Sequence, residues 1–165
     1  MDGRLDAIDL MILRELQQDG RLSVVDLAQR VGLSPSPCLR RLRALEERNV
    51  IDGYRALVNP RAIGLGLEAF VFFRVESHAQ APLNQLRQAL LALPEVVAFY
   101  ALAGDPDAML HVTVPDLAAF EQFLYDRVMT LPIRTVRSSF VLRVHKKPAP
   151  LPLGHLEAAI AADRT

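Results

Sequence analysis

The sequence predicts an α+β protein in which an N-terminal winged helix-turn-helix is followed by a ferredoxin-like βαββαβ sandwich. Through the first third of the chain, apolar residues recur at helical spacing and a glycine separates two of the helical segments. Beyond residue 66, strand-like apolar segments alternate with segments of helical spacing. These observations divide the chain into a helix-turn-helix at 1–60, a linker at 61–66, a sandwich at 67–147, and a proline-rich arm and tail at 148–165.

Composition narrows the class of protein. Of the 165 residues 51% are hydrophobic, yet no apolar run approaches the roughly 18–20 residues of a membrane span. No basic segment followed by an apolar stretch opens the sequence, so we expect no secretory signal. The single cysteine, Cys38, excludes an intramolecular disulfide and is typical of a reducing compartment. We therefore expect a cytoplasmic protein with no membrane partner.

The first two helices are predicted from spacing and capping. Apolar residues at positions 5, 8, 12 and 16 predict a helix from about Asp6 to Gln18. Ser23, with Asp26 three residues later, resembles a capping box at the start of a second helix. Gly32 then supplies a turn, because glycine accepts the left-handed backbone that commonly ends a helix.

A third helix is expected to begin at Ser34-Pro35 or at Ser36-Pro37, because serine is a favoured N-cap and proline suits the first helical position. Leucines at positions 39, 42 and 45 fall on one side of this helix. Arg40 lies nearly opposite them, and Arg41 and Arg43 flank them. The leucines are therefore expected to pack on the first two helices.

This arrangement is how a helix-turn-helix presents a recognition helix to the major groove of DNA. An ordinary amphipathic surface helix also turns arginines outward, so that alternative stays open. The candidate DNA-binding residues are Ser34, Ser36, Pro37, Cys38, Arg40, Arg41 and Arg43.

The remaining elements follow in chain order. A short strand from Tyr54 to Val58 is expected after the third helix, as in many winged helices. The sandwich is then predicted to have the order strand, helix, strand, strand, helix, strand. Its four strands are expected at Glu68–Val75, Val96–Ala103, Asp107–Val114 and Thr135–Val144. Its two helices are expected at Pro82–Leu93 and from the cap Asp116 to Val128.

The first strand of the sandwich and the last segment of the chain are both candidates for subunit contacts. Both alternating sets of residues in the first strand are largely apolar, so we expect the open sheet face to bury against a second subunit. The segment from Leu156 to Ala162 has modest helical character. It is either a frayed tail or an interface clasp, and the sequence does not choose between them.

Four segments together resemble the Lrp/AsnC (feast/famine) transcription regulators of bacteria and archaea. They are the helix ending in Asp19-Gly20-Arg21, the run Val31–Cys38, the run Ile51–Tyr54, and the loop Gly104-Asp105-Pro106-Asp107 followed by Val114-Pro115-Asp116. The resemblance covers roughly residues 5 to 153. It implies a dimer formed through the sheet, often assembled further into tetramers or octamers.

The resemblance also implies an amino-acid effector bound between dimers near the acidic loop. Carried over to this sequence, the effector-binding residues are Tyr100, Ala101, Leu102, Ala103, Gly104, Asp105, Asp107, Ser138 and Ser139. Relatives have aromatic residues where Pro106 and Ala108 stand here, and proline removes an N–H donor. A shifted effector, or Asp105 and Asp107 as simple turn residues, therefore remains an alternative.

No metal-ligand spacing, phosphate-binding loop or nucleophile motif is visible, so we expect no metal, no cofactor and no enzymatic activity. The expected function is sequence-specific binding of a roughly palindromic double-stranded DNA operator in response to an amino acid. One alternative is an enzyme similar to the sirohaem decarboxylases, which share this architecture. The other is a non-specific architectural DNA-binding protein.

Overall fold

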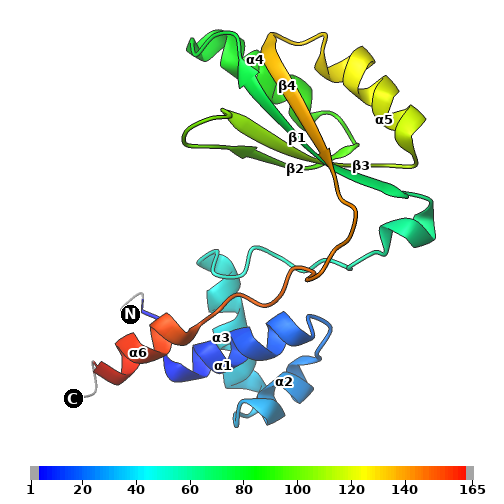
Figure 1. The fold of residues 1–165 in the computed structure, drawn as a ribbon. Coiled ribbons are helices and arrows are strands. Elements are labelled where there is room, and N and C mark those ends of the chain that lie inside the picture. The colour runs from blue at the N-terminus through cyan, green and yellow to red at the C-terminus, as the bar shows by residue number, and fades with distance from the viewer. Residues whose placement is uncertain (1–3, 163–165) are drawn as a thin grey trace. The chain divides into compact units, whose positions relative to one another are not determined.

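The computed structural model describes residues 4–162. The chain forms two compact units, one of residues 4–57 together with 146–162 and one of residues 58–145 (Figure 1). The C-terminal residues thus belong to the first unit rather than forming a separate arm and tail. Each unit is described by itself.

The first unit is built on three helices with local capping. Helix α1 (Ala7–Gln18) begins at Asp6, whose carboxylate accepts hydrogen bonds from the N–H groups of Ile8 and Asp9, and Asp9 returns a bond to the N–H of Asp6. The predicted first helix is therefore confirmed, with a capping box that satisfies otherwise unpaired N–H groups.

Helix α2 (Val24–Arg30) is capped by the Ser23 hydroxyl, and Gly32 has a φ of 70° at the turn that follows. Helix α3 (Pro35–Glu47) starts at Ser34, so the first of the two proposed Ser-Pro starts is the one used. The core of this unit comprises Leu10, Ile12, Leu13, Leu27, Ala28, Val31, Cys38 and Leu45. Cys38 takes the place on the buried side of α3 that the sequence assigned to the leucine at 39, which is only half-buried.

The strand expected from Tyr54 to Val58 is not formed. These residues are exposed, and no strand of the described chain lies beside them to complete a ladder. Tyr54 is instead held by a 3.0 Å hydrogen bond from its hydroxyl to Glu46 of α3. The prediction was wrong because a β-propensity becomes a strand only when a partner supplies its hydrogen bonds.

Helix α6 (Gly154–Ala162) packs on the same core through Leu156 and Ile160, and Leu153, just before the helix, packs there too. In Figure 1 it lies beside α1. Residues 154–162 are therefore a packed helix in this fold and not a frayed tail.

The second unit is a four-stranded antiparallel sheet in the order β2-β3-β1-β4, with two helices in the crossovers. Its elements are η1 (Pro60–Ile63), β1 (Leu67–Val75), α4 (Gln80–Leu91), β2 (Val96–Ala101), β3 (Ala108–Val114), α5 (Leu117–Phe123), η2 (Leu124–Val128) and β4 (Ile133–Phe140). This order confirms the ferredoxin-like βαββαβ prediction. The last strand lies about two residues earlier at its start than expected and ends at Phe140, not Val144.

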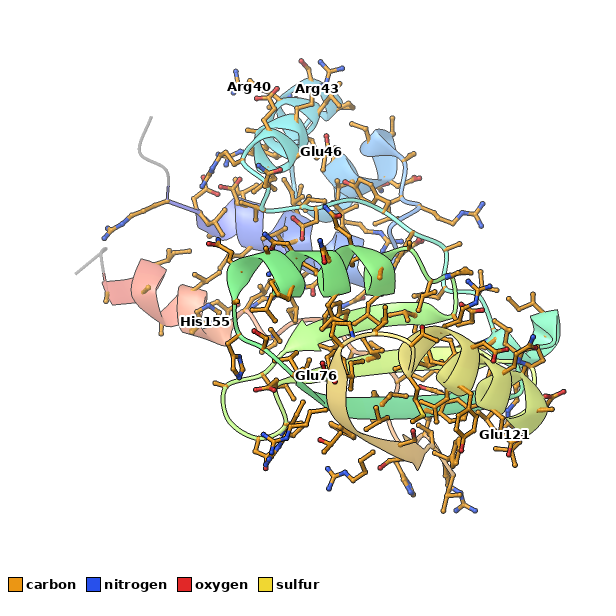
Figure 2. All side chains as sticks on the ribbon, turned by 90° about the horizontal axis from the view of Figure 1, so that it is seen from above. Arg40, Arg43, Glu46, Glu76, Glu121 and His155 are labelled. Carbon is orange, nitrogen blue, oxygen red and sulfur yellow. The ribbon has the colours of Figure 1, made fainter. Side chains whose placement is uncertain are left out.

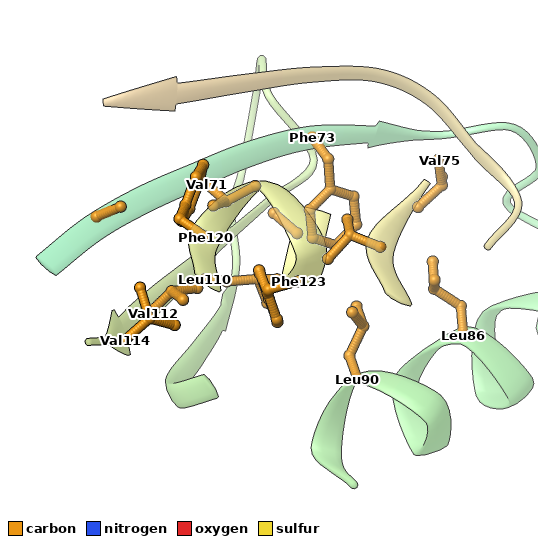
Figure 3. Close-up of a cluster of buried hydrophobic side chains, with 13 residues drawn as sticks. Val71, Phe73, Val75, Leu86, Leu90, Leu110, Val112, Val114, Phe120 and Phe123 are labelled. Atoms are coloured by element: carbon orange, nitrogen blue, oxygen red, sulfur yellow. The ribbon is translucent and has the colours of Figure 1, made fainter. Parts of the chain in front are cut away.

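Side chains from one face of the sheet and from both helices form the core of the sandwich (Figure 3). Val71 and Phe73 of β1 are fully buried, as are Leu90 of α4 and Val128 after α5. On the opposite face, Phe70 and its neighbour Phe72 remain half-buried. This alternation follows from the two-residue period of a strand.

Candidate DNA interface and effector loop

Helix α3 presents two arginines to solvent. Arg40 and Arg43 are exposed and project outward from the helix in Figure 2. Neither forms an ion pair with any residue between 4 and 162. A guanidinium without a protein partner keeps all of its donors for phosphate oxygens or base edges.

Arg41, which the sequence placed with these two, has a different role in the fold. Its Nη1 lies 2.6 Å from Oδ2 of Asp6 and 2.8 Å from Oδ1 of Asp9. The bond to Asp6 raises the pKa of Arg41 above its ordinary value. Burial opposes ionisation of Asp6, but its hydrogen bonds with the Asp9 N–H and with Arg41 lower its pKa overall. The side chain therefore joins α3 to α1 and is not free to reach DNA.

The remaining candidates lie at the start of α3. Ser34 and Ser36 are exposed, Pro37 is half-buried and Cys38 has no exposed surface. Ser34 makes no side-chain capping bond, so its hydroxyl is free beside the helix N-terminus. Burial raises the pKa of the Cys38 thiol, and this side chain cannot contact DNA.

The acidic loop is anchored to the end of β1. Asp105 receives two hydrogen bonds from the Arg74 guanidinium, and Oδ2 of Asp107 accepts a 2.8 Å bond from the N–H of Val75. Gly104 has a φ of 114°, which favours glycine, and Asp105-Pro106 is a cis peptide. The sequence did not single out Arg74, because its pairing with the loop spans a large sequence separation.

The loop thus carries opposite charges side by side at the surface. The side chains of Arg74 and Asp105 are 48% and 63% exposed, so each can exchange its partner for a ligand. His78 Nε2 lies 3.9 Å from Oδ1 of Asp107. Together these groups can meet both a carboxylate and an ammonium.

The two serines are not brought to the loop within one chain. Ser138 pairs with Val71 and Ser139 with Phe70, whereas β2, which leads into the loop, lies at the other edge of the sheet. The loop itself reaches the end of β1, where Arg74 pairs with Thr135 of β4, and Ser138 lies three residues, about 10 Å, further along β4. Ser138 lines a cavity of about 200 Å³ with Leu124 and Met129, and Ser139, the next residue along the strand, has its side chain on the other face.

Among residues 4–162 no group of three His, Cys, Asp or Glu side chains is placed to hold a metal ion. Within the same residues, no helix has the length and apolar character needed to cross a membrane.

Comparisons with known proteins match both units. The winged helix-turn-helix DNA-binding family matches residues 5–52, and the Lrp/AsnC ligand binding domain family matches residues 68–151. A leucine-responsive regulatory protein of Rhizobium meliloti is 42% identical over 140 residues, which are 84% of this chain and 90% of that protein.

Solved structures agree. A transcriptional regulator of Neisseria meningitidis in complex with L-methionine has a TM-score of 0.87 and 39% identity, over 92% of this chain and 99% of that one. An AsnC family transcriptional regulator of Agrobacterium tumefaciens has a TM-score of 0.86 and 40% identity, over 92% and 99% of the two chains.

The free arginines of α3, the helix-turn-helix that carries them and the attached ligand-binding domain define a DNA-binding transcriptional regulator. The sequence identity to these relatives and the coverage of both chains also show the family: the chain belongs to the Lrp/AsnC family.

Proposed function

We propose that this regulator binds a specific, roughly palindromic DNA operator and that an amino acid changes this binding. The observation that carries the DNA part is the pair of unpartnered arginines, Arg40 and Arg43, on the second helix of the helix-turn-helix. The Ser34 and Ser36 hydroxyls beside the N-terminus of α3 would hold a phosphate and fix the register of the helix on DNA.

The Arg74–Asp105 pair supports an amino-acid effector. The two ends of an amino acid carry the charges of this pair, so its carboxylate would replace Asp105 at Arg74 and its ammonium would take the freed Asp105. Breaking the exposed Arg74–Asp105 pair to form one pair with each end of the amino acid costs little, because a surface ion pair is worth about 0–1 kcal/mol. The Neisseria relative was solved in complex with L-methionine, an amino acid that carries both of these charged groups.

The open face of the sheet supports self-association. Phe70 stacks on His111 with ring centroids 4.9 Å apart, and the guanidinium of Arg137 lies 5.1 Å from the centre of the Phe72 ring. His111 is also bonded to Glu68 at 2.7 Å. An apolar centre with polar groups at its margin is the composition of a subunit interface, and a dimer would place two recognition helices about one helical turn of DNA apart.

The deciding experiment is a titration of the purified protein against the DNA upstream of its own gene. Random DNA serves as competitor, and L-methionine and then the other amino acids are added. We expect saturable binding that survives the competitor and shifts with at least one amino acid. Binding that random DNA removes equally well would instead indicate an architectural protein.

The Arg40→Ala variant sharpens this experiment. If Arg40 reads a base, its loss costs about 1–3 kcal/mol and relaxes specificity at one operator position. Arg87→Ala is the matched control, because Arg87 is an exposed arginine of α4 in the other unit. Equal effects of the two substitutions would contradict the assignment of α3 as the recognition helix.

A further inference from the structure

The C-terminal segment is built into the DNA-binding unit although it lies outside both matching family regions. Those regions cover residues 5–52 and 68–151, whereas α6 spans Gly154–Ala162. The chain therefore leaves the first unit near residue 57, forms the sandwich, and returns at residue 146. Two covalent connections join the two units.

An apolar stripe docks α6 on α1. Leu153, Leu156 and Ile160 recur at helical spacing and are partly buried against the core of the first unit. Leu16 of α1 and Ile8, about two turns before it, are partly buried against the same core. Burial of three such side chains is enough to hold a short helix that would be marginal alone.

Polar contacts fix the register of this docking. The side-chain amide of Gln17 accepts a 2.5 Å hydrogen bond from the N–H of Leu151 and donates one of 3.4 Å to its carbonyl. Arg14 forms an ion pair with Glu157. Leu151, before α6, and Glu157, within it, are therefore held at two levels along α1.

The segment from Pro148 to Pro152, which precedes α6, has the composition of a stiff linker. Pro148, Pro150 and Pro152 alternate with other residues, and all three are exposed. A proline restricts its own φ and keeps the preceding residue extended, so such a segment behaves as a semi-rigid rod of about 3.1 Å per residue. We call residues 146–153 the strap.

We propose that the strap and the docked α6 transmit displacement of β4 to α1, and so couple the sandwich to the DNA-binding unit. The strap begins six residues after the end of β4, and β4 pairs with β1, which carries Arg74 of the proposed effector site. The coupling to effector rests on the proposed function, whereas the mechanical restraint does not. A flexible linker alone would leave the DNA-binding unit free to move whatever happened to β4.

Two variants separate coupling from stabilisation. Replacing the three strap prolines by serine softens the strap without changing a buried contact, since all three are exposed. Replacing Leu156 and Ile160 by glutamate releases α6. The matched control is Ala158→Glu, which adds a charge on an exposed position of the same helix.

The first readout needs neither DNA nor effector. Spin labels on exposed Gln18 and Arg87 report the distribution of distances between the units, and excess unlabelled protein removes signals between protomers. Buried Cys38 stays in place. We expect a broader distribution in the softened variant, the broadest in the released variant, and no change in the control. Equal widths in all four proteins would overturn the proposal.

The second readout is the change in operator Kd caused by L-methionine. We expect the softened variant to keep its thermal stability and its Kd without effector. Its effector-induced change in Kd should be smaller than that of the wild-type protein by about threefold or more. A softened variant that broadens yet responds fully would refute coupling through the strap. If the wild-type protein does not respond to any amino acid, the effector part of the proposed function fails, and the distance distribution still decides whether the strap restrains the units.

Discussion

The Nη1 atom of Arg41 in α3 lies 2.8 Å from Oδ1 of Asp9 in α1, and Asp9 is only 6% exposed. The pair spans 32 positions of sequence and connects the recognition helix to the first helix of the unit. Of three neighbouring arginines on α3, one is therefore held by carboxylates of the first helix and its cap, and two face solvent. This division sets the expectations for each of them.

Arg41→Ala should lower the free energy of unfolding by about 2 kcal/mol, because Asp9 would be left as a buried carboxylate without its charged partner. Urea unfolding measures the loss. The double variant Arg41→Ala/Asp9→Asn should recover part of it, since the unpaired charge is gone. A loss no larger than that of Arg40→Ala would show that the pair contributes nothing.

Arg43→Ala should weaken DNA binding similarly for all sequences if Arg43 contacts a phosphate. The slope of log Kd against log salt concentration should then become shallower by about one. Fluorescence polarisation at several salt concentrations gives the slope. An unchanged slope with a change of sequence preference would place Arg43 on a base instead.

The stability of the first unit should fall in acid. The pKa of Asp6 is lowered in the folded state, so its contribution is present above the ordinary pKa of 3.8 and is lost as pH falls through the lowered folded value. Asp6→Asn keeps a capping oxygen but has no charge, so it should flatten this part of the pH profile. Thermal unfolding between about pH 2 and 5 tests this, and a variant profile as steep as that of the wild type would assign the loss to other carboxylates.

Asp105→Asn should weaken effector binding by up to about fivefold without changing DNA affinity in its absence, because an exposed ion pair with an ammonium is worth about 0–1 kcal/mol. Calorimetric titration with the effector measures the affinity. Asp126→Asn, an exposed carboxylate on η2, is the control. Wild-type affinity in Asp105→Asn would show that the loop aspartate is only a turn residue.

Gly66→Ala should destabilise the sandwich by about 1–3 kcal/mol. A Cβ at this position would lie 2.9 Å from the carbonyl oxygen of Pro115, and that oxygen also accepts the N–H of Gly66. Gly154→Ala, where a Cβ meets nothing within 4 Å, should be neutral or slightly stabilising at the start of α6. Equal melting temperatures for the two variants would contradict this close approach.

The elements predicted correctly depend on local signals. Ser23 caps α2, Gly32 takes a left-handed backbone and Ser34 starts α3, and each of these needs only its near neighbours in sequence. The alternation of β1 likewise predicted its two faces. The sandwich topology followed from the order of such segments.

The errors have non-local causes. Tyr54 has strand propensity, but its partner is a side chain of α3, not a second strand. Arg41 resembles its neighbours in sequence, and only the position of α1 separates it from them. Cys38 and the leucine at 39 are both apolar enough to be buried, so the helical wheel could not choose which of them lies on the buried side of α3.

The sequence by itself determined the helix-turn-helix, the sandwich topology and the family resemblance, because capping, glycine turns and hydrophobic period act over a few residues. The tertiary structure alone decided that Arg74 holds Asp105, that Ser138 and Ser139 lie further along β4 from the loop, and that α6 docks on α1. Each of these depends on which distant segments meet. That choice is made by the burial of whole faces, which no local pattern encodes.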